Sequence, residues 1–264
     1  MPKITVNNIS MYYEQHGSGD PLVLIGGLTA DHQVWKSALR ILSKHFHVLI
    51  FDNRGAGQTD APNIPYTTMM MAKDTLALMT ALNIPRAHIV GHSLGGCIAQ
   101  QMALIAPDKI NKLVIACSRA KPNTLATMVL TMREKLQSLG MTDDVLAEYV
   151  MPFLFSETFL SQAMQVKGFI QWTLNNAYPQ TAIGYQQQLH AVAHHDVEAQ
   201  LSKIMIPTLV IAGEEDCLMP AKYGKAIAEM IPNSVFKIIA DCAHMPHVEK
   251  SHEFAERVIE FIDP

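Results

Sequence analysis

Short, almost purely apolar runs alternate with helix-like stretches in the first half of the chain, and this alternation limits the fold more than any other feature. Four such runs come first, at 22–25, 48–51, 89–90 and 113–116. Strands buried on both faces of a parallel sheet have this composition, because helices cover both of their sides. The stretches between the runs have helix-like spacing, around 34–43, 69–82 and 94–105. Repeated strand–helix alternation predicts βαβ units with right-handed crossovers.

The two ends of the chain complete this pattern. Residues 3–16 alternate apolar and polar side chains around a turn candidate at Asn7-Asn8, which predicts an N-terminal β-hairpin. Strand-like runs return at 208–212 and 235–239, and an amphipathic helix is expected over about 251–262. The predicted fold class is α/β, with a mostly parallel, doubly wound sheet and an antiparallel hairpin at its start.

The alternation stops after Cys117. From residue 119 to residue 196 the chain has only helical spacing, with methionine, leucine and aromatic side chains at irregular intervals. We therefore predict two parts, a core made of 1–118 and 197–264 and a helical insertion made of 119–196.

Composition and charge narrow the partners. The chain has 264 residues, 49% of them hydrophobic, and a formal net charge of −4 without a long block of like charge. Nucleic acid and anionic membranes are therefore not expected as partners. No apolar run of about 18 residues indicates a membrane span, and the N-terminus lacks a secretory-signal pattern. A small molecule is the expected partner, and the oligomeric state is open between monomer and homodimer.

The cysteines indicate the compartment. The four of them lack the spacing of a metal or disulfide framework, and they are Cys97, Cys117, Cys217 and Cys242. We expect reduced thiols in a cytoplasmic protein, most of them packed as small core hydrophobes.

The strongest chemical signal is the segment Gly91-His92-Ser93-Leu94-Gly95. It fits G-x-S-x-G directly after an expected strand and directly before an expected helix, the context of a nucleophile elbow. A Cβ on either glycine would collide with adjacent backbone. The turn lifts the serine hydroxyl above the sheet and places the partly positive helix N-terminus beneath it. A glycine-rich turn with an incidental serine is the alternative, and the flanking elements favour a nucleophile.

Over nearly its whole length the chain resembles a capped α/β-hydrolase of the esterase, lactonase and haloperoxidase-like group. In that family a turn after the first parallel strand supplies a backbone N–H to an oxyanion hole. The resemblance places this turn at 25–28 and makes the Leu28 and Leu94 N–H groups the two donors. The family usually has histidine where this chain has Gly26. A main-chain donor survives that change, but how the loop is held is left open.

The same resemblance supplies the partners of Ser93. Asp216 follows a late strand and matches the family's acid, with Glu214 and Glu215 as alternatives. Some members place the acid after the strand that follows the nucleophile helix, but residues 116–119 contain no carboxylate. His244 follows the last strand, matches the family's base and completes the order Ser, Asp, His.

Two further segments carry weaker expectations. The segment 52–59 is similar to a family loop beside the site and is interpreted as structural, since no G-K-[ST] follows to bind phosphate. The insertion corresponds to a helical cap, whose apolar side chains suit an apolar acyl or alcohol group, although at least half of them must build the cap's own core. The candidate substrate-binding residues are Gly27, His92, Trp35, Met128, Phe153 and Trp172.

Acyl transfer on these residues gives the leading hypothesis, a serine hydrolase that cleaves a small or medium carboxylic ester or a lactone. His244 would take the proton of Ser93 during attack, and Asp216 would orient the imidazole. The mechanism needs neither a metal nor an organic cofactor. A cofactor-free haloperoxidase or C–C hydrolase with the same triad is the enzymatic alternative. A non-catalytic ligand receptor of the same fold is the other.

Overall fold

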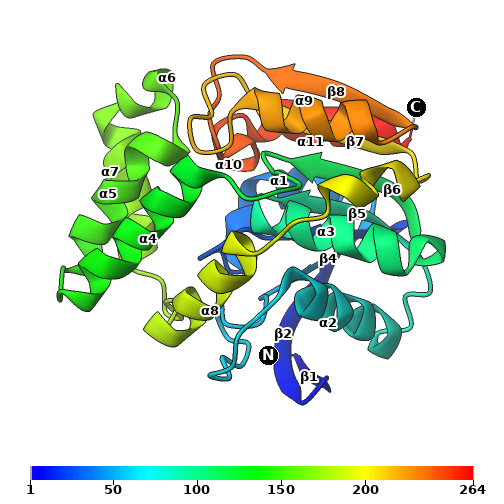
Figure 1. The fold of residues 1–264 in the computed structure, drawn as a ribbon, viewed down its shortest axis with the longest axis horizontal. Coiled ribbons are helices and arrows are strands. Elements are labelled where there is room, and N and C mark those ends of the chain that lie inside the picture. Colours follow the sequence, from blue (N-terminus) through cyan, green and yellow to red (C-terminus); the bar gives the residue numbers. More distant parts are fainter. Residues whose placement is uncertain (1, 264) are drawn as a thin grey trace.

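The computed structural model describes residues 2–263 and shows one mixed sheet of eight strands in the order β1-β2-β4-β3-β5-β6-β7-β8. The strands are β1 Lys3–Val6, β2 Ile9–His16, β3 Pro21–Ile25, β4 His47–Phe51, β5 Ala87–His92, β6 Ile110–Ala116, β7 Thr208–Gly213 and β8 Ser234–Ile239. Strands β1 and β2 are antiparallel to their neighbours, and β3 to β8 pair in parallel. The predicted fold class is confirmed (Figure 1).

The N-terminal hairpin turns at the predicted place. Val6 pairs with Ile9, and the two residues between them, Asn7 and Asn8, have φ of 46° and 61°. Asparagine tolerates this left-handed region better than most residues, because its short polar side chain can bond locally. The Asn-Asn pair therefore fixes the register of β1 on β2.

The apolar runs are continuous because each strand faces a core on both sides. In β3, Val23 and Ile25 belong to one apolar cluster, while Leu22 and Leu24 belong to a second cluster. Successive side chains of a strand point to opposite faces, so one run supplies both cores. The edge strand β8 differs, since its Val235 and Ile238 are about half exposed.

The helices of the core lie on the two faces of this sheet. One cluster takes side chains from α2 Thr68–Ala81, α3 Leu94–Ile105 and α9 Ala221–Met230. The other takes them from α1 Lys36–Leu42 and α11 Ser251–Ile262, and the short α10 Pro246–Glu249 packs against both. The sequence patterns predicted α2, α3 and α11 within one residue or better, but did not single out α9 or α10.

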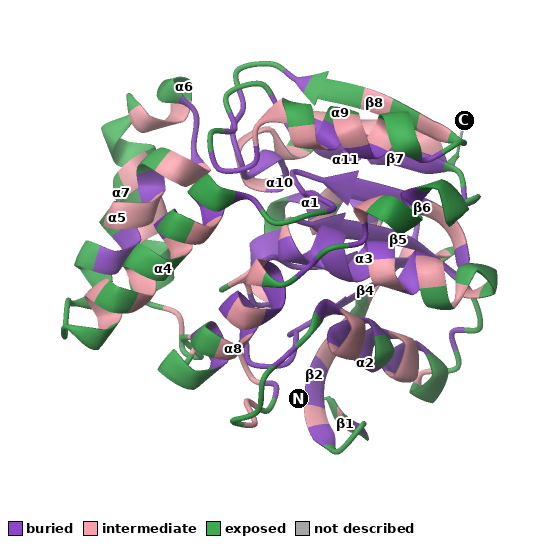
Figure 2. Ribbon diagram, viewed as in Figure 1, coloured by how far each residue is buried: buried purple, intermediate pink, exposed green. Residues whose placement is uncertain are grey.

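Five helices lie between β6 and β7, where helical spacing alone was expected. They are α4 Thr124–Ser138, α5 Asp143–Leu154, α6 Glu157–Leu160, α7 Ala163–Leu174 and α8 Ala182–Ala193. In Figure 1 they lie at the end of the sheet toward which the β8 arrowhead points. Figure 2 shows buried strands in the core and much exposed surface on α4 to α7. No helix within residues 2–263 is both long and apolar enough to cross a membrane.

Candidate active site

Ser93 lies on the turn between β5 and α3 in a strained conformation. Its φ of 54° and ψ of −115° are rarely adopted by a residue with a side chain. The neighbouring glycines make room for it, because a Cβ on Gly91 would overlap the Gly95 carbonyl oxygen and a Cβ on Gly95 would overlap that of Ile25. The Ser118 hydroxyl donates to the Ser93 carbonyl oxygen over 2.7 Å. Steric fit and this hydrogen bond hold Ser93 at the carboxyl end of β5.

The structure brings Asp216 and His244 to this serine from two other strand ends. The His244 Nε2 lies 3.0 Å from the Ser93 Oγ, and its Nδ1 lies 2.8 Å from the Asp216 Oδ2. The second Asp216 oxygen accepts from the Met219 N–H over 2.7 Å. With the Nδ1 proton donated to Asp216, Nε2 is free to accept the Ser93 hydroxyl proton. Asp216 and His244 are 3% and 2% exposed, so water competes little for these bonds.

The two neighbouring acids point elsewhere. A Glu214 carboxylate oxygen accepts from the Asp241 N–H over 3.3 Å, and a Glu215 oxygen accepts from the Glu157 N–H over 2.8 Å. Neither forms a hydrogen bond with His244 in residues 2–263, and Asp216 is the carboxylate that does.

Glu249 fixes the loop that carries His244. One of its oxygens accepts from the Ala243 N–H over 2.9 Å, and the other accepts from the Ser156 N–H and hydroxyl over 2.9 and 2.6 Å. The His244 N–H itself donates to the Leu154 carbonyl over 3.1 Å. The loop after β8 is thus bonded directly to the end of α5 and the start of α6.

His92 supports the site as a neutral ring. Its Nε2 donates to the His244 carbonyl oxygen over 2.7 Å. Burial, together with the nearby His247 and His244, holds the pKa of His92 well below its ordinary value. A neutral His92 beside Ser93 positions the His244 loop without adding a charge.

The loop after β3 is held by a side chain that the sequence did not single out. The Asn53 amide donates to the Gly26 carbonyl over 3.0 Å, and both are buried. A Cβ on Gly27 would lie 3.2 Å from the Ser93 Cβ, so the loop approaches the serine closely. Within the described chain, the N–H groups of Leu28 and Leu94 have no hydrogen-bond acceptor. Both residues line the cavity above Ser93.

The polar side chains of segment 52–59 form hydrogen bonds and an ion pair with other parts of the protein. One Asp52 oxygen accepts from the His32 N–H over 2.7 Å, and the other accepts from the Gln58 N–H over 2.8 Å. Arg54 forms a bidentate pair with Asp74 at 2.7 and 2.8 Å, both side chains buried. These bonds leave neither group directed toward a phosphate. Asp31 also offers an oxygen within 4.8 Å of ligand atoms of His32 and Asp52, a geometry that could hold a cation. However, the Asp31 and Asp52 oxygens already accept hydrogen bonds from backbone N–H groups of the surrounding loops.

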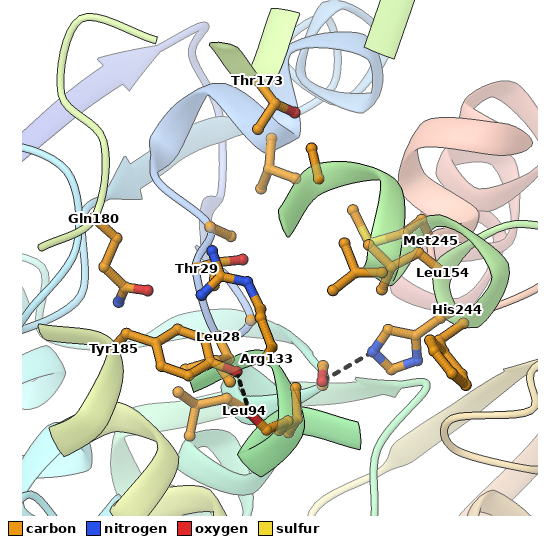
Figure 3. Close-up of a pocket in the computed structure, with 18 of the residues that line it drawn as sticks. Leu28, Thr29, Leu94, Arg133, Leu154, Thr173, Gln180, Tyr185, His244 and Met245 are labelled. Atoms are coloured by element: carbon orange, nitrogen blue, oxygen red, sulfur yellow. Dashed lines mark hydrogen bonds between the residues drawn. The ribbon is translucent and has the colours of Figure 1, made fainter. Parts of the chain in front are cut away.

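A cavity of about 240 Å³ opens above Ser93, between the strand ends and the insertion (Figure 3). Four of the six candidate binding residues line it, namely Gly27, His92, Phe153 and Trp172.

The remaining two candidates, Trp35 and Met128, do not line this cavity. Trp35 is fully buried and packs against His247 at 4.5 Å between ring centroids, within the apolar cluster that α1 and α11 cover. Met128 is 66% exposed on the outer face of α4.

Several polar residues that were not expected there also line the cavity. Among them are Arg119, Arg133, Gln180 and Tyr185. Arg119 is fully buried and donates to the Val192 carbonyl over 2.8 Å. Both arginines are basic residues of the insertion, but Arg119 lies in the segment between β6 and α4 and Arg133 lies on α4. Which way these side chains point depends on how the insertion packs, and no pattern in the sequence fixed that.

A family model described as the alpha/beta hydrolase fold matches residues 20–251. The chain belongs to the α/β-hydrolase fold family. It is 28% identical to a protein of Pseudomonas syringae pv. syringae (strain B728a) provisionally named carbamate hydrolase RutD, covering 94% of this chain and 95% of that one. It is 26% identical to 3-oxoadipate enol-lactonase 2 of Acinetobacter baylyi (strain ATCC 33305 / BD413 / ADP1), covering 97% and 94%.

A solved structure agrees with this assignment. The enol-lactonase of Burkholderia xenovorans LB400 matches with a TM-score of 0.90 and 27% identity, over 100% of both chains. The family resemblance expected from the motifs is confirmed, and the chain is a hydrolase with this fold.

Proposed function

We propose that the protein hydrolyses a small carboxylic ester or lactone through an acyl-enzyme on Ser93. The observation that carries this proposal is the hydrogen-bonded chain from Ser93 through His244 to Asp216, at 3.0 and 2.8 Å, with the serine facing the cavity. A free serine hydroxyl is a poor nucleophile at neutral pH, and an adjacent oriented base is what activates it.

The steps follow from the geometry. The Ser93 Oγ attacks the substrate carbonyl carbon while its proton passes to the His244 Nε2. Asp216 fixes the tautomer and stabilises the imidazolium. His244 then returns the proton to the leaving alkoxide oxygen as the C–O bond breaks, which leaves an acyl group on Ser93. Water then adds to this ester while His244 takes its proton, and on collapse the C–O bond to Ser93 breaks, His244 returns the proton to the Ser93 Oγ, and the acid is released.

The developing oxyanion needs donors placed in advance, and the Leu28 and Leu94 N–H groups suit this role. Both lie at the cavity and have no acceptor in the described residues, and Leu94 is the first residue of α3, where the helix dipole adds a partial positive charge. Removal of one such donor typically costs about 10²–10³ in rate. This chain has Gly26 where the family usually has histidine, and the Asn53–Gly26 hydrogen bond would hold the loop after β3 in its place.

The insertion, which we propose acts as a cap over Ser93, supports a small substrate. The cavity of about 240 Å³ lies below the ~300–1,000 Å³ common for drug-sized ligands. The enol-lactonases among the relatives favour a lactone or ester. A carbamate is the second candidate. The RutD relatives favour it, and Ser93 could attack its carbonyl carbon in the same way.

The test is hydrolysis by purified protein of a panel of esters and lactones varied in acyl and alcohol length, with a carbamate arm. We expect turnover of short esters, and Ser93→Ala should lower kcat by about 10⁶-fold, as loss of the nucleophile does in well-studied serine hydrolases. Mass spectrometry of the wild type during turnover should show the acyl group on the peptide that contains Ser93.

A matched control removes a hydroxyl just past the end of the neighbouring strand β6. Ser118→Ala deletes the donor to the Ser93 carbonyl but leaves the proposed nucleophile, so it should retain most of the turnover. Turnover by Ser93→Ala at the wild-type rate, or an acyl group on another residue, would refute the acyl-enzyme mechanism.

A further inference from the structure

Arg133 is a charged residue of the cavity wall to which the proposed mechanism gives no role. It lies on α4, lines the same cavity as Ser93, and is only partly exposed. Its guanidinium carbon lies 4.4 Å from the centroid of the Tyr185 ring. In the view of Figure 3 the guanidinium projects into the cavity, between Gln180 and Tyr185 on one side and His244 on the other.

One nitrogen of this guanidinium lacks a partner. The Arg133 Nη1 is buried and has no hydrogen-bond acceptor, and no ion pair among residues 2–263 involves the Arg133 guanidinium. Arginine stays charged at any physiological pH, so a buried, unsatisfied donor on it carries a large desolvation penalty. The stacking on Tyr185 offsets part of that penalty but supplies no acceptor for Nη1.

The two acidic residues that also line the cavity, Asp31 and Asp143, do not form an ion pair with Arg133. One Asp31 oxygen accepts from the Gln33 N–H over 2.8 Å and the other accepts from the Asn176 amide over 2.8 Å, so both oxygens already have donors. Asp143 begins α5 and is exposed to solvent. Neither forms an ion pair with Arg133 in the described part of the chain.

The Gln180 side chain adds a second unmatched group beside Arg133. Its amide nitrogen donates to the Gly55 carbonyl over 2.8 Å and to the Gln188 Oε1 over 2.9 Å, which fixes the amide. Its own oxygen is then buried and without a donor, and it lines the cavity. One wall of the cavity therefore has a cationic donor, the Arg133 Nη1, and a neutral acceptor, the Gln180 Oε1, and neither has a hydrogen-bond partner among the described residues.

We infer that Arg133 binds a carboxylate on the substrate, separate from the carbonyl that Ser93 attacks, so that the enzyme prefers half-esters or lactones that carry a free acid. This inference rests on the proposed esterase or lactonase activity. A guanidinium matches a carboxylate with two parallel N–H···O bonds, and the Gln180 oxygen would accept from a hydroxyl or N–H next to it. The Ser93 side of the cavity performs the chemistry, and the Arg133 wall selects the substrate.

The first experiment measures kcat/KM for a matched pair of substrates, monomethyl succinate and methyl butyrate, which differ in the terminal carboxylate. The wild type should prefer the half-ester. Arg133→Met keeps the aliphatic packing and removes the charge, and it should lower kcat/KM for the half-ester by about 10- to 100-fold, the effect of one charge-assisted hydrogen bond. The rate on methyl butyrate should change little. Arg133→Lys should recover part of the preference.

The control for charge and fold is Lys135→Met. Lys135 is two residues further along α4 and exposed, and it does not line the cavity. This variant makes the same change in net charge but should keep the wild-type ratio between the two substrates. If Arg133→Met lowers both rates equally, Arg133 only braces Tyr185 and the inference is wrong. A wild type that prefers methyl butyrate also overturns it.

A binding measurement separates this inference from the proposed hydrolysis. Calorimetric titration of Ser93→Ala with succinate and with the uncharged succinamide needs no turnover. Binding of succinate should exceed that of succinamide and should disappear in Ser93→Ala/Arg133→Met. Equal, weak binding of both compounds would refute the carboxylate site even if esters are cleaved. Selective succinate binding by a protein that cleaves no ester would instead refute the proposed function alone.

Discussion

The turns that hold Ser93, Asp216 and His244 and the insertion that lies over them differ in how their charges are satisfied. In the turns, both oxygens of Asp216 and both oxygens of Glu249 accept hydrogen bonds. The buried ring nitrogens that lack partners there belong to neutral histidines. On the insertion, by contrast, buried nitrogens of two permanently charged side chains, Arg119 and Arg133, lack a partner. The comparison indicates that the carboxylates of the turns are satisfied within the protein, whereas the guanidinium of Arg133 on the insertion is not.

Glycines show the same difference. A Cβ on Gly95 would overlap backbone, as would one on Gly213 at the end of β7. A Cβ added to Gly168, within α7, would meet no atom within 4 Å. In α8, by contrast, a Cβ on Gly184 would meet the carbonyl of Gly55. The turns are thus sterically determined, whereas α7 has room for a side chain at Gly168.

Of the variants that test this comparison, Asp216→Asn should have the strongest effect, and it tests the bond between Asp216 and His244 in the turns. The Asn amide can present an N–H to the His244 Nδ1, which favours the tautomer whose Nε2 carries the proton and cannot accept one from Ser93. We expect kcat to fall by about 10⁴-fold with little change in the melting temperature. Steady-state kinetics on a cleaved ester measure the effect.

Glu215→Gln is the matched control for that change. Its carboxylate caps the Glu157 N–H at the start of α6 and does not reach His244. It should keep the wild-type kcat. Equal losses in both variants would show that general negative charge near the loop matters, and not the bond between Asp216 and His244.

A pair of alanine substitutions tests the steric difference. Gly95→Ala drives a Cβ into the Ile25 carbonyl oxygen, where backbone must move, so the free energy of unfolding should fall by about 3 kcal/mol. Gly168→Ala adds a Cβ in open space inside α7 and should raise it by about 0.5–1 kcal/mol. Urea unfolding measures both values. Similar effects of the two substitutions would remove the distinction between the turns and the insertion.

The fold was predictable because the periodicities that specify it are local. The runs of Leu22–Ile25 and Val48–Phe51 had to be buried on both sides, and a parallel sheet between two helical layers does this. The residues of the site were predictable to the extent that turn geometry restricts them. Ser93 needs the glycines two residues before and after it, Gly91 and Gly95, so this requirement is visible within a segment of five residues.

The cavity walls were not predictable, for a reason that α4 illustrates. Val129, Arg133 and Gln137 recur at intervals of four and line the cavity. Met128 and Met132 recur at the same interval one residue earlier and are 66% and 46% exposed. The methionine stripe is the more apolar of the two, so hydrophobicity alone indicates the wrong face. Which stripe faces inward depends on tertiary packing, and the same holds for Trp35, which turns into the core from a short 3₁₀ helix.

A predicted effect smaller than that of Gly95→Ala concerns the neutral histidines behind the turns. His247 is fully buried against Trp35 and His92, with ring centroids 4.5 and 4.4 Å away, and neither of its nitrogens has a partner among the described residues. Burial, with a smaller contribution from His244, lowers the pKa of His247 from 6.5 to about 3. Below pH 6.5 the unfolded chain therefore binds a proton at this position that the folded chain does not.

Stability must consequently fall as the pH drops below 6.5, and it continues to fall until the pH approaches 3. For His247 the loss is about 2 kcal/mol between pH 6.5 and 5, at about 1.4 kcal/mol per pH unit. His247→Phe keeps an aromatic ring and removes the titration, so the slope of unfolding free energy against pH should fall by about that amount, while part of the slope remains because His92 is also held neutral. His252→Phe, at a side chain 76% exposed, should leave the slope unchanged. An unchanged slope in His247→Phe would mean that the ring takes up a proton in the folded protein, and that the turns are less completely satisfied than their hydrogen bonds indicate.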